Sequence, residues 1–231
     1  MVKVKICGIT NYDDAIAALD QGADAIGFNF YSKSSRYIAP ADAREIVDKL
    51  PPFVNIVGVF VNEFNLAAVK SIAEMVKLST IQLHGNESQE YCAQLTAWRI
   101  IKALRVSETF NPEHVKDFRV SAILLDAYAA DTYGGTGALF DWRLALAAKH
   151  YVPRIILAGG LKPDNVVAAI RTVKPYAVDV CSGVEESPGR KDRVLLQTFM
   201  QEVQRGRQEM MKSTTSKFSR AIIEDTLNRN T

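Results

Sequence analysis

Short hydrophobic runs and helix-like stretches alternate along most of the chain. Eight runs rich in Val, Ile, Leu and Phe predict buried β-strands, and apolar residues at three- and four-residue spacing between them predict helices. The strands are expected at residues 2–7, 25–30, 55–60, 80–84, 99–104, 122–127, 154–159 and 177–182. The helices are expected at residues 13–19, 41–50, 66–75, 87–95, 142–148 and 163–173.

The length of the repeat favours parallel strands joined by helical crossovers. From Cys7 to Cys181 the chain covers 174 residues in seven intervals, which gives about 25 residues per unit. Eight units without a ninth favour an α/β fold, a single closed (βα)8 TIM barrel with eight parallel strands. An open, doubly wound sheet is the alternative.

The end of the chain has a different pattern. We assign residues 1–204 to the barrel domain and residues 205–231 to a polar C-terminal tail, in which 221–227 is a short apolar helical stretch. A solvated tail that is partly helical or disordered is expected, and docking on the barrel or on a partner is the alternative.

Composition and charge narrow the class of protein. The 28 Lys and Arg residues against 26 Asp and Glu residues give a net charge of +2, so the charge does not indicate a nucleic acid or a membrane surface as partner. Three cysteines and three distant histidines do not form a disulfide framework or a zinc motif. Without a secretory leader or a membrane-spanning run, we expect a cytoplasmic protein, monomer or homodimer, with no bound metal.

Polar residues interrupt the predicted strands on one face. Because side chains alternate along a strand, Lys5 and Cys7 share a face of the first strand, and Asp179 and Cys181 share a face of the eighth. Closure of the barrel would bring Lys5 near Asp179 in the lumen. We expect an ion pair, for which mutual neutralisation of two buried charges is as good an account as catalysis.

Chemically capable residues stand at the carboxyl ends of three predicted strands. Cys7 ends the first strand, His84 the fourth and Asp126 the sixth, and this rim is where barrel enzymes carry out their chemistry. Each residue alone also fits a purely structural role, but their coincidence on one rim indicates an active site.

Two glycine-containing turns indicate a phosphate site. Gly159 and Gly160 follow the seventh strand, and Ser182 and Gly183 follow the eighth. Backbone N–H groups in such turns can approach an anion closely, and these two loops commonly hold a phosphate in this fold. A third cluster, at 134–137, lacks the lysine of a P-loop and is interpreted as a lid. Arg36, after the second strand, could pair with a carboxylate.

Seven short motifs stand out along the chain. They are KICGIT at 5–10, GFNF at 27–30 leading to SRYI at 35–38, QLHG at 82–85, LLD at 124–126, GGTG at 134–137 with FDW at 140–142, LAGGL at 157–161, and VDVCSGVE at 178–185. In their order and spacing, over residues 2–204, these motifs resemble the phosphoribosylanthranilate isomerase family of the tryptophan pathway.

The resemblance implies a reaction and a set of roles. The family performs an Amadori rearrangement of N-(5-phosphoribosyl)anthranilate to 1-(2-carboxyphenylamino)-1-deoxyribulose 5-phosphate, without a cofactor. Asp126 matches the general acid that protonates the ribose ring oxygen, and Cys7 matches the general base that removes the proton from the second sugar carbon. Arg36 matches the group that meets the anthranilate carboxylate. The turns at Gly160 and at Ser182 and Gly183 match the family's phosphate-binding site. His84, Gly159 and Asp179 are further candidates for substrate binding.

The sequence also departs from the family pattern. Ser34 and Ser35 precede Arg36 where a proline is usual, which puts the rigidity of that loop in question, and Cys181 stands where serine is commoner. An ordinary thiol with a pKa of about 8.5 is only a few per cent thiolate at neutral pH, so something must favour the Cys7 anion.

Three other functions remain to be compared. The histidine-pathway isomerase carries out the same chemistry on the same fold, but its site resembles a pair of aspartates, whereas the first predicted strand of this chain ends in Cys7. A Schiff-base aldolase would need a rim lysine, whereas Lys5 and Lys102 lie in mid-strand. A phosphate-binding barrel without catalytic activity would need neither Cys7 nor Asp126.

Overall fold

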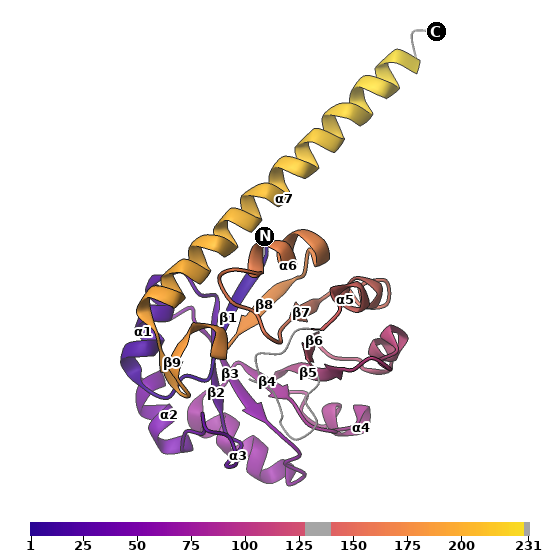
Figure 1. The fold of residues 1–231 in the computed structure, drawn as a ribbon. Coiled ribbons are helices and arrows are strands. Elements are labelled where there is room, and N and C mark those ends of the chain that lie inside the picture. Colours follow the sequence, from indigo (N-terminus) through magenta and orange to yellow (C-terminus); the bar gives the residue numbers. More distant parts are fainter. Residues whose placement is uncertain (128–139, 229–231) are drawn as a thin grey trace.

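Eight parallel strands close a barrel in the computed structural model, which describes residues 1–127 and 140–228, with the backbone alone for 213–228 (Figure 1). Each strand pairs with the next one along the chain, and β1 pairs with β8. The strands are β1 (Lys3–Cys7), β2 (Ala25–Asn29), β3 (Asn55–Phe60), β4 (Thr80–Leu83), β5 (Arg99–Val106), β6 (Ala122–Ala127), β7 (Ile155–Leu157) and β8 (Ala177–Val180). The closed barrel is confirmed, and the open sheet is excluded.

Helices form the outer shell of the barrel (Figure 1). They are α1 (Tyr12–Asp20), α2 (Pro40–Val47), α3 (Leu66–Val76), α4 (Gln89–Cys92), α5 (Trp142–Ala148), α6 (Val166–Val173) and α7 (Arg193–Asn228), with short 3-10 turns η1 (Pro112–Asp117) and η2 (Ser182–Val184). Asn11, Asn65 and Ser88 cap α1, α3 and α4 by accepting hydrogen bonds from first-turn N–H groups. The fifth crossover has η1 where the pattern predicted no helix.

The alternation of side chains along the strands produces two hydrophobic layers. Val4 and Ile6 of β1 belong to the large cluster between strands and helices. A smaller cluster from the other faces of the strands fills the barrel; its members are Val57, Ile101, Ala103, Ala122, Leu124, Ile156, Ala158 and Ala177. The chemistry is thereby confined to the end of the barrel beyond this packed layer.

The expected ion pair inside the barrel is present. Lys5 lies opposite Asp179 in the β1–β8 register, and their Nζ and Oδ2 atoms are 2.8 Å apart, with both side chains buried. Burial alone would lower the pKa of Lys5, but Asp179 and then Cys7 raise it above its ordinary value. Lys5 is therefore a positive charge held beneath Cys7.

The C-terminal helix is longer than the sequence pattern indicated. A helix was expected only at 221–227, but α7 runs from Arg193 to Asn228 without a break at residue 204. The division of the chain into a barrel domain and a tail at residue 204 stays a prediction. Its first half packs on α6, where Gly206 lies close to Ile170, and the rest extends away from the barrel (Figure 1). Good helix formers such as Gln, Arg, Glu, Met and Lys dominate residues 201–212. Across the described helices, none has the length and apolarity that a bilayer crossing needs.

Candidate functional site

A cavity at the carboxyl ends of the strands collects nearly all of the predicted site residues. Those that line it are Cys7, Arg36, His84, Asp126, Gly159, Gly160, Asp179 and Ser182. Gly183 does not line the cavity but packs directly beneath the neighbouring turn. Within the described ranges, the His, Cys, Asp and Glu side chains form no group of three or more suited to a metal ion. The proposed lid at 134–137 lies outside the described residues.

Cys7 lies among groups that stabilise its thiolate. Gly27 stands opposite Cys7 in the register, and a Cβ there would lie 3.0 Å from Cys7 Sγ and 3.2 Å from Lys5 Nζ, so the missing side chain makes room for both. Contact with the Cys181 thiol, followed by the charges of Lys5 and Lys191, lowers the pKa of Cys7 well below its ordinary value, although burial acts in the opposite direction. The structure thus supplies the activation of Cys7 that the sequence left unexplained.

The second thiol shows the complementary effect. The neighbouring Cys7 thiolate, and burial after it, raise the pKa of Cys181 well above its ordinary value, so of the two thiols Cys7 ionises and Cys181 keeps its proton. Cys181, which stands where serine is commoner, therefore still places a weak hydrogen-bond donor beside Cys7.

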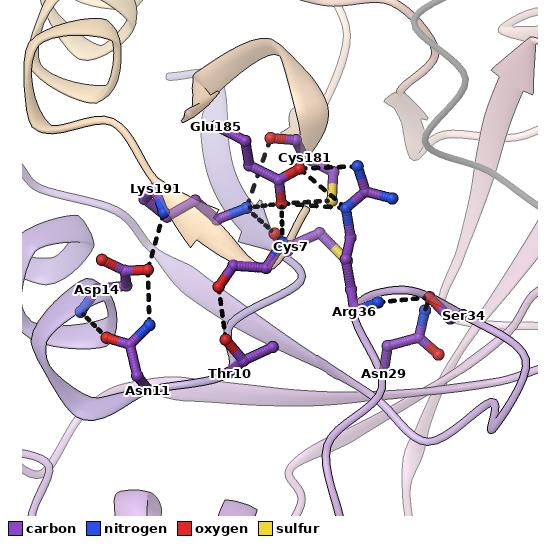
Figure 2. A network of polar contacts seen from close by, with 11 residues as sticks. Cys7, Thr10, Asn11, Asp14, Asn29, Ser34, Arg36, Cys181, Glu185 and Lys191 are labelled. Atoms are coloured by element: carbon purple, nitrogen blue, oxygen red, sulfur yellow. Dashed lines mark hydrogen bonds and ion pairs between the residues drawn. The ribbon is translucent and has the colours of Figure 1, made fainter. Parts of the chain in front are cut away.

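Arg36 is held by a carboxylate that the sequence analysis had not assigned (Figure 2). Its Nε lies 3.0 Å from both carboxylate oxygens of Glu185, and its Nη2 lies 2.7 Å from Oε2. Lys191 Nζ lies 2.8 Å from Glu185 Oε1 and donates to the backbone oxygen of Cys7 at 2.6 Å. Glu185 thus binds one edge of the guanidinium and leaves the other N–H groups for a ligand.

The loop that carries Arg36 has its own constraints in place of the missing proline. Ser34 Oγ accepts hydrogen bonds from Asn29 Nδ2 at 3.0 Å and from the Arg36 N–H at 3.1 Å (Figure 2). Gly8 has a φ of +74°, and a Cβ on it would lie 2.8 Å from both Arg36 Cδ and Cys181 Sγ. The serine and the glycine together fix the path of Arg36.

Both carboxyl oxygens of Asp126 have a polar partner. Its own neighbour, the Ala127 N–H, donates to Oδ1 at 2.9 Å, and His84 Nε2 lies 3.2 Å from Oδ2. Gln82, two residues before His84 on β4, has its Nε2 atom 2.9 Å from His84 Nδ1. These contacts hold the Asp126 carboxyl group in place at the cavity.

The two glycine turns meet at one side of the cavity. Gly159 and Gly160 have φ angles of +76° and +62°, and a Cβ on Gly159 would lie 2.5 Å from the Ala127 nitrogen. A Cβ on Gly183 would lie 1.9 Å from the backbone oxygen of Leu161. Only glycine allows this packing, which sets the two turns side by side. Backbone N–H groups in turns of this kind can bind an anion.

The lysines on the strands are engaged elsewhere. Lys102 Nζ lies 2.9 Å from Glu87 and donates to the backbone oxygen of Gly85 at 2.6 Å, and its side chain is 2% exposed. Lys5 is a protonated partner of Asp179. Neither amine is free to form a Schiff base, which counts against the aldolase.

Three contributors to the site escaped assignment from the sequence. Glu185 and Gln82 lie inside the family motifs, but the motifs alone assign them no role. No sequence pattern points to Lys191, because its ammonium group reaches the site only through the folding of a hairpin, formed by β9 (Glu185–Ser187) and β10 (Arg190–Lys191). The hairpin is tied to the barrel by Thr10, which donates to the Gly189 oxygen at 2.5 Å, and by Asp14, which accepts from the Lys191 N–H at 2.8 Å.

Together, the barrel and its rim define a class of protein: an enzyme of the TIM-barrel type with an activated thiol, a carboxyl group and an anion cradle around one cavity. The family model described as N-(5'phosphoribosyl)anthranilate (PRA) isomerase matches residues 4–202. The chain belongs to this family, and it is an isomerase of tryptophan biosynthesis.

Individual relatives agree over almost their whole length. The N-(5'-phosphoribosyl)anthranilate isomerase of Geobacter sp. (strain M21) is 52% identical over 205 residues, which cover 89% of this chain and 99% of the relative. The crystal structure of the isomerase from Thermotoga maritima has a TM-score of 0.83 and 45% identity, covering 88% of this chain and 99% of the other. A second crystal structure of the isomerase, with reduced 1-(o-carboxyphenylamino)-1-deoxyribulose 5-phosphate bound, has a TM-score of 0.80, 45% identity and the same coverage.

Proposed function

We propose that Cys7 and Asp126 are the general base and the general acid of an Amadori rearrangement of N-(5-phosphoribosyl)anthranilate in this cavity. Asp126 protonates the ribose ring oxygen, so that the sugar opens to a Schiff base. Cys7 removes the proton from the second sugar carbon, and the resulting enolamine tautomerises to 1-(2-carboxyphenylamino)-1-deoxyribulose 5-phosphate. The proposal requires no metal or organic cofactor.

The observation that carries this proposal is the environment of Cys7. A base must be ionised before it can accept a proton, and the positive charges of Lys5 and Lys191 with the Cys181 thiol favour the thiolate. A phosphate-binding barrel without catalytic activity would have no use for an activated thiol in its cavity, and a carboxyl group shares that cavity.

The remaining candidates are proposed to bind the substrate. The turns at Gly159, Gly160, Ser182 and Gly183 would hold the phosphate through backbone N–H groups and the Ser182 hydroxyl. Arg36, fixed by Glu185 along one edge, would offer its other N–H groups to the anthranilate carboxylate.

Two further side chains would complete the binding surface. Asp179 Oδ1 is buried without a hydrogen-bond partner among the described residues and would accept a bond from a sugar hydroxyl. His84 lines the same cavity between Gln82 and Asp126. The cytoplasmic location and the choice between monomer and homodimer stay predictions.

The test of the function is an activity assay. Phosphoribosylanthranilate is generated in place, and isomerisation is followed by the loss of its anthranilate fluorescence. We expect Cys7→Ala and Asp126→Ala each to lose several orders of magnitude in turnover with a modest change in KM, and Arg36→Ala to raise KM. Near-normal turnover in Cys7→Ala would refute the base assignment, and unchanged kinetics in Arg36→Ala would remove Arg36 from the site. A parallel assay with the histidine-pathway substrate tests for a second activity.

A further inference from the structure

A polar chain of three buried side chains ends at the proposed acid. Gln82 lies on β4 and His84 directly follows the end of this strand, whereas Asp126 is the second-to-last residue of β6. Their exposed fractions are 1%, 8% and 5%. The contacts are 2.9 Å from Gln82 Nε2 to His84 Nδ1 and 3.2 Å from His84 Nε2 to Asp126 Oδ2.

The direction of the first contact determines where the histidine carries its proton. In the side-chain orientation that Gln82 has in the structure, its Nε2 faces His84 Nδ1. Since an amide nitrogen only donates, Nδ1 accepts in this arrangement, and a neutral ring then carries its proton on Nε2. That N–H points at Asp126, where it can donate to the carboxylate. The reverse tautomer would turn an Nδ1–H toward the amide N–H groups of Gln82, so that two donors would face each other.

We infer that Gln82 is a positioning residue that holds His84 as its Nε2–H tautomer, so that His84 donates to Asp126 and keeps its carboxyl group aimed into the cavity. The inference rests on the proposed role of Asp126 as general acid. In addition to lining the substrate cavity, His84 then affects catalysis through its contact with Asp126. When Asp126 releases its proton to the ring oxygen, the His84 N–H and the Ala127 N–H stabilise the carboxylate that is formed.

The position of Gln82 has a cost that packing alone does not explain. Its other amide atom, Oε1, is buried and has no hydrogen-bond partner among the described residues. An unpaired buried acceptor costs about 1–3 kcal/mol, and an apolar side chain of similar size at this position would avoid it. The amide is therefore better accounted for by the bond that it donates to His84.

The tautomer can be measured without any reaction. The chain contains three histidines, and the other two, His114 and His150, are exposed. The double variant His114→Gln/His150→Gln leaves His84 as the only source of ring signals in a two-bond ¹H–¹⁵N spectrum. The free protein should give the pattern of a neutral ring with its proton on Nε2. A ring with its proton on Nδ1 would overturn the inference, even if the protein isomerises its substrate normally.

Variants of Gln82 test the consequence for catalysis. Gln82→Glu places an acceptor opposite Nδ1 and should move the proton of His84 to Nδ1, and Gln82→Met removes the bond with little change in volume. Both should lower kcat about 10-fold to 100-fold and change KM less than about 3-fold, because the lost interaction serves the transition state. Since a buried glutamate could impair folding, Gln82→Met provides the same kinetic test without a new charge.

The matched control comes from the same strand. Thr80 is buried two residues before Gln82 and lines the opposite end of the barrel, so Thr80→Val should leave kcat and the His84 spectrum unchanged. If the Gln82 variants lower kcat no more than Thr80→Val, or leave the His84 tautomer unchanged, the inference is wrong. If the wild-type protein does not isomerise phosphoribosylanthranilate, the proposed function fails instead, and the spectrum still decides the tautomer.

Discussion

Replacement of Glu185 by glutamine should reveal how strongly the site depends on one buried carboxylate. The Glu185 side chain is 4% exposed and binds two cations, Arg36 at 14% exposure and Lys191 at 0%. Glutamine has almost the same volume, so the change removes the charge while it preserves the packing.

The expected loss follows from the two cations that remain. Removing one partner of a buried ion pair costs about 3–5 kcal/mol, because a desolvated charge is left without compensation. For a chain of this length, each kcal/mol shifts the melting temperature by about 2–4 °C, so Glu185→Gln should lower Tm by about 6–20 °C. Adding Lys191→Met should recover part of this loss, because the fully buried ammonium is then gone as well.

The dependence on pH gives the sign of the effect. Burial would raise the pKa of Glu185, but Arg36 and Lys191 together hold it below its ordinary value. A lowered folded-state pKa contributes stability above the unfolded value of about 4.3, and this contribution is lost as the pH falls through the folded value. The gap between wild type and Glu185→Gln should therefore be full at neutral pH and shrink below about pH 4.

The neighbouring residue supplies the control. Glu186 is 58% exposed and lies 3.9 Å from Arg190, so Glu186→Gln should change the free energy of unfolding by less than about 0.5 kcal/mol. Urea unfolding of the wild type, Glu185→Gln and Glu186→Gln measures the differences in the free energy of unfolding. A Glu185→Gln variant within about 1 kcal/mol of wild type would refute the account of the buried cluster.

Two further predictions concern the base and the turn beside it. The rate at which iodoacetamide alkylates Cys7, followed by mass spectrometry as a function of pH, should have its midpoint at a pH well below that of an ordinary thiol. Lys5→Met should move this midpoint to higher pH. Equal midpoints in the two proteins would contradict the role of the lysine charge. Gly8→Ala should lower turnover at least about 10-fold, because the φ of Gly8 is +74° and a Cβ on it would lie 2.8 Å from two neighbouring side chains. The control is Gly22→Ala, since Gly22 has a φ of +89° but open space around it. This variant should lose only about 1 kcal/mol of stability and keep its turnover. Equal turnover in the two glycine variants would show that the crowding at Gly8 is unimportant.

The fold could be predicted from local patterns because a parallel barrel repeats one simple rule. Eight buried runs of similar spacing leave few alternatives, and the alternation of side chains correctly paired Lys5 with Asp179 across the closure. Gln82 and His84 are two residues apart, so the same alternation places their side chains on one face. Which of their atoms meet depends on side-chain rotamers, which a sequence pattern does not contain.

The support around Arg36 could not be found in the same way. Arg36 and Glu185 are 149 residues apart. Lys191 reaches Glu185 because the short hairpin of β9 and β10 brings its ammonium group to the end of β1, at the backbone oxygen of Cys7. A charged residue in a loop has many possible partners, and the sequence alone does not select among them. Only 221–227 of the long α7 was predicted as helical. Residues 205–220 have a polar composition that a search for buried faces does not detect. Residues 193–204 do present a buried face, formed by Leu196, Phe199, Met200 and Val203, so this part of the helix could have been predicted from its spacing.

The most direct test of the central claim is a crystal structure of this protein with the reduced product analogue that is bound in the related isomerase structure. We expect the analogue's phosphate on the turns at 159–160 and 182–183, with Cys7 Sγ and an Asp126 carboxylate oxygen on opposite sides of the sugar, each within about 3.5 Å of it. If the thiol or the carboxyl group pointed away from the sugar, the assignment of base and acid would be contradicted.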